Sequence, residues 1–339
     1  MRRIGLGLAV ALIAAVSAVA QTARDEAGTA PAFDAALAAA KELPRLHSLL
    51  VSWRGDIVLE RYYNGATATR PANVKSVAKS VISALVGIAV DRRLITDVDT
   101  PIATYFPELT RDARKATITV EDLLTMRSGL ESTSNRNYGA WVLSRNWVQF
   151  ALTRPLVAEP GSVMDYSTGN SHLLSAILTK VTRTTTWQFA NDTLARPLGF
   201  TLTRWPRDPQ GIYFGGNDML LTPRQMVAFG ELYLRDGRID GRQILPERWI
   251  ERSWVGRDRS SWSGQMYGYG WWIRDLAGRR AYYAWGFGGQ YIFVIPELDL
   301  VVVTTSSPTV AEDRRSHRRT LFELVEDLVV APIAARGES

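Results

Sequence analysis

The chain has 339 residues, of which 46% are hydrophobic, and its formal net charge is +6. This length and apolar content suit one large globular domain or two closely packed lobes. The chain has no cysteine, which excludes disulfides, thiolate catalysis and cysteine-bound metals. Its 35 arginines and five lysines are scattered rather than clustered, so we expect no nucleic-acid partner.

The first 20 residues have the pattern of a cleaved export signal. Arg2 and Arg3 precede an apolar run over 4–16, and small residues at 18–20 form a cleavage site. The run is short for a bilayer span, although an uncleaved membrane anchor is the alternative. Loss of the two arginines would lower the net charge from +6 to +4. We expect a periplasmic or secreted protein that has no membrane anchor after cleavage of residues 1–20.

The segment that follows, 21–40, is small and polar at first and then alanine-rich, which predicts a helix over 33–42. Two strand-like runs come next, over 47–53 and 57–63, on either side of a turn at 54–56. Short apolar runs around a Gly-Asp turn are typical of a β-hairpin. A two-stranded hairpin is marginal alone, so this one needs partners from elsewhere in the chain.

The middle of the chain is predicted to be mainly helical, and its end returns to strands. Apolar spacing and capping patterns predict helices over 76–93, from Thr119 to about Met126, over 171–181 and from Pro223 to about Arg235. Strand-like runs follow over 267–274, 281–285, 291–295 and 300–305, and an amphipathic helix is predicted over 315–330.

The order of these elements predicts an α/β (α+β) fold, with one antiparallel sheet flanked by helices and a mainly helical lobe. The hairpin is expected to join the C-terminal strands, so that the sheet lobe comprises about 41–75 and 255–335. The helical lobe comprises about 76–254, and both lobes belong to one domain over 41–335. The helix that begins near Ser76 would lie at the seam between the lobes, where ligand clefts commonly form.

Ser76 and Lys79 stand at the start of the helix predicted over 76–93. Positions three apart lie on one helix face, so the lysine amine can reach the serine hydroxyl. A desolvated lysine can act as the base toward a serine nucleophile, and a helix N-terminus favours an oxyanion. With 22 serines and five lysines, chance supplies roughly a third of one such pair, so an ordinary helix start is the alternative.

Four segments, in chain order, resemble motifs of the penicillin-recognising, class C β-lactamase-like serine hydrolases. This family includes D,D-peptidases, carboxylesterases and 6-aminohexanoate-dimer hydrolase. The segments are Ser76–Ser80, Ile118–Leu130, Glu159–Thr168 and Gly286–Ile292. The Gly-Gly-Gln form of the last segment and the Arg-Ser-Gly-Leu form of the second are similar to the 6-aminohexanoate-dimer hydrolase branch. The resemblance covers about 45–310 and implies a β-lactamase-like fold and serine hydrolase activity.

The resemblance also implies a role for each residue that matches a family motif. Ser76 corresponds to the nucleophile, Lys79 to its base and Tyr166 to a second proton carrier. The oxyanion hole would use the backbone N–H groups of Ser76 and Phe287. Cations near Tyr166 would favour its phenolate form. Candidate substrate-binding residues are an aromatic on the loop after the second motif and two glycines that allow close backbone approach, namely Tyr138, Gly286 and Gly288.

Two departures from the family pattern bear on the substrate. Thr168 stands two residues after Tyr166, where the family often has asparagine. The Lys-Thr-Gly start of the third element, whose lysine helps hold a substrate carboxylate, is missing, because no lysine follows Lys180. A small-molecule ester or amide is therefore favoured as substrate over a β-lactam. The alternatives are a D,D-peptidase or β-lactamase-type enzyme, and a non-catalytic β-lactam or peptidoglycan sensor of the same fold.

No metal or organic cofactor is expected. His47, His172 and His317 lie far apart in the sequence, so neither a Ser-His-Asp triad nor a metal site is predicted, and each is expected to be structural. Most of the eleven tryptophans are expected in the core, while some could form an apolar wall of the cleft. The candidates for that wall are Trp262, Trp271, Trp272 and Trp285.

Overall fold

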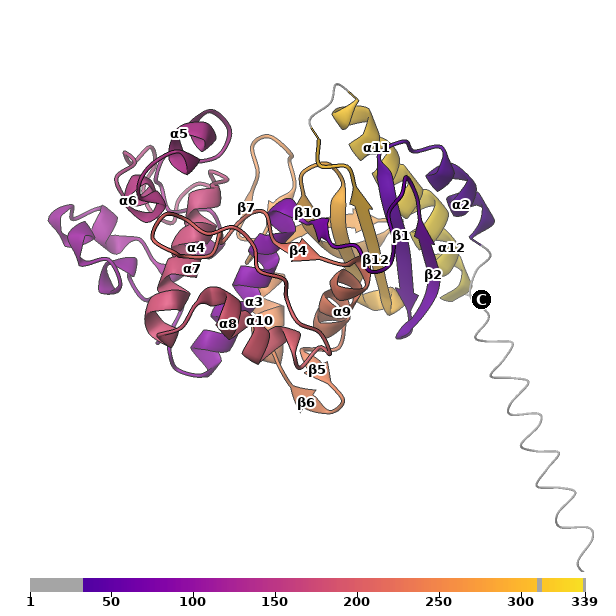
Figure 1. Cartoon of the computed structure of the whole chain (residues 1–339), viewed down its shortest axis with the longest axis horizontal. Coiled ribbons are helices and arrows are strands. Elements are labelled where there is room, and N and C mark those ends of the chain that lie inside the picture. The colour runs from indigo at the N-terminus through magenta and orange to yellow at the C-terminus, as the bar shows by residue number, and fades with distance from the viewer. Residues whose placement is uncertain (1–32, 310–312, 338–339) are drawn as a thin grey trace, which may run out of the picture.

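A computed structural model describes residues 33–309 and 313–337, and the predicted signal over 1–20 lies outside these residues. An eight-stranded antiparallel sheet has the strand order β2-β1-β12-β11-β10-β9-β8-β7 (Figure 1). The strands are β1 (Leu46–Trp53), β2 (Asp56–Tyr62), β7 (Asp258–Arg259), β8 (Met266–Tyr267), β9 (Trp272–Leu276), β10 (Arg279–Gly286), β11 (Gln290–Ile295) and β12 (Leu300–Ser306). Two small two-stranded pairs are β3 (Ala72–Asn73) with β4 (Leu220–Leu221), and β5 (Arg238–Ile239) with β6 (Arg242–Gln243).

The middle of the chain supplies most of the helices, as predicted, and they gather on one side of the sheet (Figure 1). Thr119 forms a capping box with Asp122 at the start of its helix. Thr222 forms a second capping box with Gln225, and Pro223 is the first residue of that helix. The α-helices are α2 (Asp34–Lys41), α3 (Ala78–Asp91), α4 (Val120–Leu124), α5 (Tyr138–Val142), α6 (Trp147–Leu152), α7 (Thr168–Thr182), α8 (Thr186–Ala190), α9 (Pro223–Leu234), α10 (Glu247–Ser253), α11 (Arg314–Val325) and α12 (Ala331–Gly337).

The N-terminal hairpin joins the sheet formed by the C-terminal strands, as predicted. β1 pairs antiparallel with β12, in a register that places Leu50 opposite Val303. The turn between β1 and β2 has two residues with positive φ, Arg54 at 55° and Gly55 at 89°, which suits a tight hairpin. The hairpin would be marginal alone, and β12, from the other end of the chain, supplies the pairing that it needs.

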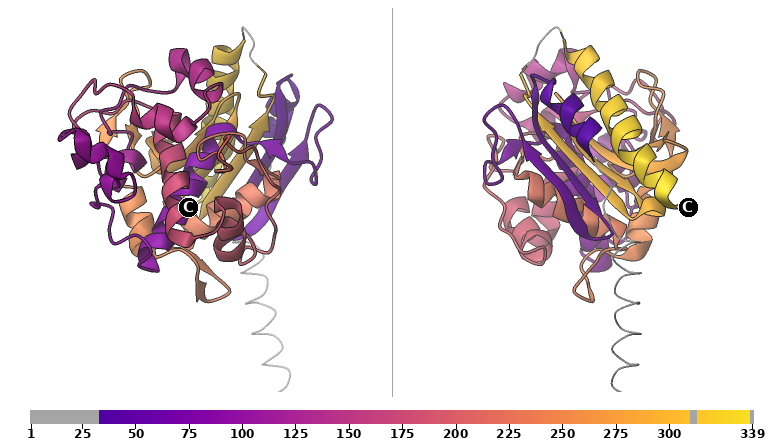
Figure 2. Two further views of the ribbon diagram at one scale, coloured as in Figure 1. Left: turned by 60° about the vertical axis from the view of Figure 1, so that its left-hand side comes forward. Right: turned by 90° about the vertical axis from the view of Figure 1, so that its right-hand side faces the viewer.

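The sheet separates two hydrophobic cores, because successive side chains of a strand point to opposite faces. On β1, Leu49 and Val51 belong to one core and Leu50 belongs to the other. The helices α2, α11 and α12 cover the first core (Figure 2). The second core is covered by α9 and α3, and α3 is buried continuously from Ala78 to Ala89. This arrangement places α3 between β10 and α7.

The structure corrects three predicted boundaries. The strand predicted over 267–274 is two strands, β8 and β9, joined by a tight turn in which Gly270 has a φ of 80°. The turn docks on α3, where the Ser80 hydroxyl donates to the Gly270 carbonyl at 2.6 Å. The helix predicted from 171 begins at Thr168, and the closing helix continues to Gly337. Within the described stretches, no helix combines the length and the apolar character that a membrane crossing requires.

Candidate active site

Ser76 lies in a single 3-10 turn, Lys75–Val77, that leads directly into α3. Lys75 has a φ of 51°, so the chain turns sharply just before the serine. The helix direction brings Lys79 back onto Ser76, and the lysine Nζ lies 2.9 Å from the serine Oγ. The two predicted partners are therefore within hydrogen-bonding distance at the N-terminus of a buried helix.

Lys79 is only 3% exposed, and its burial lowers the pKa of its amine from 10.5 to about 7. Its Nζ also donates to the Gly216 carbonyl at 2.7 Å and lies 3.4 Å from the Thr168 hydroxyl. A neutral amine has two N–H bonds and one lone pair. Because the Gly216 carbonyl can only accept, it takes one N–H, and Thr168 can take the other. The lone pair is then directed at the Ser76 hydroxyl.

Gly216 is a contributor to this site that sequence reasoning missed. A Cβ at this position would lie 3.1 Å from the Lys79 Nζ and 2.8 Å from the Thr168 Cγ2, so only glycine lets the carbonyl come so close. A Cβ on Gly215 would overlap the Ser171 carbonyl. The Gly215-Gly216 pair was the only signal in the sequence for this contact, but the pair lies in a loop that has no helical or strand periodicity to place it.

A buried histidine, His172, is hydrogen-bonded to the backbone of Gly215. The Gly215 N–H donates to the His172 Nδ1 at 3.4 Å, and the His172 Nε2 lies 3.0 Å from an Asp208 carboxylate oxygen. Both side chains are fully buried. His317 bonds instead to Ser306 at 3.1 Å. Within 33–309 and 313–337, no three His, Asp or Glu residues come together in a way that could hold a metal ion.

Tyr166 lies just before α7 and completes the polar centre of the site. The Lys79 Nζ lies 5.0 Å from the centre of its ring. Burial raises its pKa above the usual value of 10, while its polar interaction with the nearby Ser76 opposes that shift. Our expectation that nearby cations favour the phenolate is therefore wrong. With a pKa of about 7, Lys79 is mainly neutral above that pH, and desolvation keeps Tyr166 as a phenol that can donate a proton.

A run of three hydroxyl residues, Ser132 to Ser134, holds the Tyr166 segment, and sequence reasoning missed it too. The Ser132 hydroxyl donates to the Tyr166 carbonyl at 2.7 Å. The Ser134 hydroxyl accepts from the Thr168 N–H at 3.0 Å and bonds to its hydroxyl at 2.9 Å. Thr168, at the position where the family often has asparagine, is thus held in contact with Lys79.

The third predicted element ends β10 beside Ser76. A Cβ on Gly286 would overlap the Val74 carbonyl, so its glycine is explained by close approach to the segment before the nucleophile. A two-residue turn joins β9 to β10 and pairs Leu276 with Arg279, so Arg279 and every second residue after it point their backbone groups at the β9 edge. Pairing with β9 stops at Tyr283. Phe287 directly follows Gly286, as the first residue of the turn that leads to β11.

The other two predicted substrate-binding residues lie in different settings. Gly288 has a φ of 89°, and a Cβ there would lie 2.6 Å from the Ser307 carbonyl, so the turn after β10 accounts for its glycine. The Tyr138 hydroxyl accepts a hydrogen bond from the Asn217 amide at 2.7 Å. Asn217 directly follows Gly216, so Tyr138 is linked to the loop that contacts Lys79.

The four candidate wall tryptophans divide between the two faces of the sheet. Trp271 is fully buried in the α3 core, where its ring centre lies 4.5 Å from that of Tyr233, so it is not part of a cleft wall. Of the other three, Trp272 and Trp262 contact Tyr166. Its ring stacks on Trp272 with centres 5.7 Å apart and meets Trp262 edge-on at 6.4 Å. Trp285 lies 5.2 Å from Trp262.

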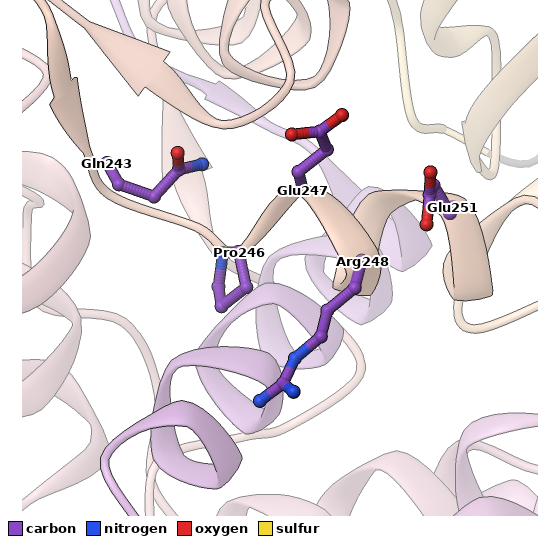
Figure 3. Close-up of a pocket in the computed structure, with 5 residues that line it drawn as sticks. All are labelled: Gln243, Pro246, Glu247, Arg248 and Glu251. Carbon is purple, nitrogen blue, oxygen red and sulfur yellow. The ribbon is translucent and has the colours of Figure 1, made fainter.

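A separate surface hollow lies at α10 and is lined by Gln243, Pro246, Glu247, Arg248 and Glu251 (Figure 3). The labelled side chains point in different directions rather than toward a common centre. Trp249 of the same helix packs against Gly87, two turns beyond Lys79 on α3. The hollow therefore lies toward the far end of α3 and is not the Ser76 site.

Comparisons with known proteins agree with this fold. A β-lactamase family model matches residues 45–326. An uncharacterized protein of Alkalihalophilus pseudofirmus is 24% identical over 288 residues, which are 76% of this chain and 82% of that protein. A candidate 6-aminohexanoate-dimer hydrolase from Bacillus anthracis superposes with a TM-score of 0.69 at 23% identity, over 84% of this chain and 81% of that one.

Two further solved structures share the fold at lower identity. A penicillin-binding protein homologue from Caulobacter crescentus has a TM-score of 0.69 at 17% identity, over 89% of this chain and 99% of that one. Simvastatin synthase from Aspergillus terreus has a TM-score of 0.70 at 16% identity, over 89% of this chain and 99% of its own. The predicted β-lactamase-like fold is thus confirmed, and the chain belongs to the β-lactamase family of serine hydrolases and penicillin-binding-protein-like proteins.

Proposed function

We propose that the protein hydrolyses an ester or amide bond of a small molecule through an acyl-enzyme on Ser76. The observation that carries this proposal is the pairing of Ser76 with Lys79. Their Oγ and Nζ atoms lie 2.9 Å apart, and burial lowers the pKa of the amine to about 7. A neutral amine at hydrogen-bonding distance from a serine hydroxyl is what general-base activation requires.

In the acylation step, Lys79 takes the proton of Ser76 while the Oγ bonds to the substrate carbonyl carbon. The backbone N–H groups of Ser76 and Phe287 are the proposed donors to the oxyanion, and the N-terminus of α3 adds partial positive charge there. When the tetrahedral intermediate collapses, the bond from the carbonyl carbon to the leaving oxygen or nitrogen breaks. The leaving atom takes the proton of Tyr166.

Tyr166 then recovers a proton from the Lys79 ammonium, which returns both groups to their neutral forms. Burial raises the pKa of Tyr166, so the phenolate formed in this step is a strong base and is reprotonated readily. Water next attacks the acyl carbon and gives a proton to the same amine. The bond between that carbon and the Ser76 Oγ then breaks, and the Lys79 ammonium returns the proton to the serine. No step in this sequence needs a metal or an organic cofactor.

Covalent labelling tests the nucleophile directly. A small fluorophosphonate, followed by mass spectrometry of the digested protein, is expected to label Ser76 and no other serine. Ser76→Ala should abolish labelling, whereas Ser162→Ala, at an exposed serine of the surface, should retain it. A label on another residue, or one that persists in Ser76→Ala, would overturn the proposal.

A substrate panel tests the reaction class. A short-chain nitrophenyl ester and a linear amide should be turned over faster than a chromogenic cephalosporin or a D-Ala-D-Ala peptide, because no lysine follows Lys180 to hold a substrate carboxylate. Faster turnover of the cephalosporin or the peptide would favour a β-lactamase or D,D-peptidase. A stable stoichiometric adduct without turnover would favour a sensor.

We also propose that the protein is exported, with the charged and apolar pattern of residues 1–20 as support. N-terminal sequencing of the protein from fractionated cells should find Gln21 as the first residue, in the periplasmic or culture fraction. A full-length chain retained in the cytoplasm would contradict this.

A further inference from the structure

Three tryptophans form a closed group beside Tyr166, and we call Trp262, Trp272 and Trp285 the tryptophan cluster. Their ring centres lie 5.5 Å apart for Trp262 and Trp272, 5.2 Å for Trp262 and Trp285, and 5.5 Å for Trp272 and Trp285. The loop between β7 and β8 and two neighbouring strands each contribute one ring. The cluster is therefore held by β9, β10 and the adjoining loop, beside the candidate site.

One ring of the cluster is open to solvent. Trp262 is 54% exposed, whereas Trp272 is buried. One face of the Trp285 ring is covered, because the Arg318 guanidinium lies 5.3 Å over it. The open apolar surface of the cluster is therefore mainly that of Trp262.

The exposed ring is not needed to close its own loop. The Ser260 N–H donates to the Gln265 carbonyl at 2.9 Å, and the Gly264 N–H donates to the Ser260 carbonyl at 2.8 Å. The Arg259 guanidinium also donates to the Gly264 carbonyl. Because these bonds already fix the loop, closure of the loop does not account for the exposed ring. The ring offers apolar surface beside the polar groups of the site, a combination typical of ligand pockets.

The position of the cluster relative to the chemistry indicates which part of a substrate would meet it. Tyr166 lies beside the Ser76–Lys79 pair, with the Lys79 Nζ 5.0 Å from its ring centre, and in the proposed function it protonates the leaving atom. Trp272 stacks on Tyr166 and Trp262 meets its edge, so the group attached to the leaving atom extends toward these rings. The residues next to Ser76 and Gly216 in the chain are polar instead, with the Tyr138–Asn217 bond at 2.7 Å and the Lys75–Asp218 ion pair at 2.9 Å.

We propose that Trp262 and Trp285 form a subsite for a flat aromatic leaving group, so that the preferred substrates are esters or amides of arylalkyl alcohols or amines. This inference rests on the proposed function. In the step concerned, the bond between the carbonyl carbon and the leaving oxygen or nitrogen breaks. That atom takes the proton of Tyr166, and the arylalkyl alcohol or amine departs along the cluster while the acyl group stays on Ser76.

The test uses esters that share one acyl group. Benzyl, cyclohexylmethyl and methyl acetate all form the same acetyl-enzyme, so differences among them report only the leaving-group side. The wild-type kcat/KM should be highest for benzyl acetate. In Trp262→Ala the ratio of kcat/KM for benzyl over methyl acetate should fall about tenfold, the order of an aromatic contact. Trp262→Phe should keep most of the ratio, because it keeps a ring.

The matched control is Ile57→Ala on β2, an apolar residue that is 42% exposed at the opposite edge of the sheet. This variant should leave the ratio at the wild-type value. Fluorophosphonate labelling of Ser76 at the wild-type rate confirms that each variant is folded. An unchanged ratio in a labelled Trp262→Ala, or equal preference for benzyl and cyclohexylmethyl acetate, would overturn the subsite alone. Failure of the wild type to label at Ser76 or to hydrolyse any acetate would overturn the proposed function and the subsite with it.

Discussion

The two sides of the candidate site are built in opposite ways. On the helical side, Lys79 is nearly enclosed, and its amine contacts Ser76, Thr168 and Gly216 within 3.4 Å. On the sheet side, the tryptophan cluster offers ring surfaces and leaves Trp262 half exposed. The difference indicates that the proton-transfer groups are fixed by several contacts each. The sheet side offers apolar ring surface instead of reacting groups, so it is the side expected to set specificity.

The largest expected effect comes from Lys79→Met, which removes the base and keeps the side-chain volume. Values of kcat/KM should fall about 10³-fold for every substrate, within the range for loss of general-base catalysis. Steady-state kinetics on the acetate series measures this loss. If the variant lost activity toward only some of the esters, the division of the site into a chemical side and a specificity side would be wrong.

Gly216→Ala tests the helical side without removing a reacting group. The new methyl group would press on Lys79 and Thr168, so we expect a loss of about 10²-fold in kcat/KM, again equal for all substrates. Gly139→Ala is the matched control, because nothing lies within 4 Å of a Cβ there. Activity of Gly216→Ala close to that of Gly139→Ala would show that the approach of the Gly216 carbonyl to Lys79 is unimportant.

Burial of Lys79 should have a pH-dependent cost in stability. The folded-state pKa is about 7 and the ordinary value is 10.5, so the unfolded chain binds more protons between these values. Wild-type stability then rises with pH across that window, and the full cost is present below pH 7. Lys79→Met should therefore raise the free energy of unfolding by about 2–3 kcal/mol more at pH 6 than at pH 9. Urea titrations at both pH values measure it, and an equal gain at the two would contradict it.

The same pKa predicts the acid limb of the rate profile. Only neutral Lys79 can accept the Ser76 proton, so kcat/KM should rise with pH and level off above about pH 7. Below that point the loss should approach tenfold per pH unit. The rate of fluorophosphonate labelling should follow the same curve. A flat profile between pH 5 and 7 would remove Lys79 as the base.

The smallest effect is expected on the sheet side. Trp262→Ala should lower the free energy of unfolding by less than about 1 kcal/mol, because the ring is half exposed and its loop is closed by backbone bonds. Trp141→Ala is the comparison, since that ring is fully buried among His172 and Phe214 and should cost about 3–5 kcal/mol. Similar losses in the two variants would mean that Trp262 is a structural residue.

The motifs and their spacing were sufficient to predict that Ser76, Lys79 and Tyr166 share one site, because each motif fixes the local geometry of its own residues. The antiparallel sheet was also predictable from the two groups of strand-like runs. Gly216 and Ser134 were not found, since their roles depend on loops that meet Lys79 only after folding. Trp271 and Trp272 show a different difficulty. Neighbours on an extended chain face opposite ways, and only the register with β10 shows which one lies beside Tyr166.

The docking of α3 against distant segments has a consequence for how the protein becomes active. The turn at Gly270 bonds to Ser80, Gly286 packs on Val74, and Gly216 bonds to Lys79. All three partners are made long after α3 during synthesis, and contacts of such large sequence separation form late in folding. A chain that ends before β10 would hold the nucleophile and its base without the strand that borders them. The chemical reactivity of Ser76 is therefore expected to report completion of folding rather than formation of the helix that bears it.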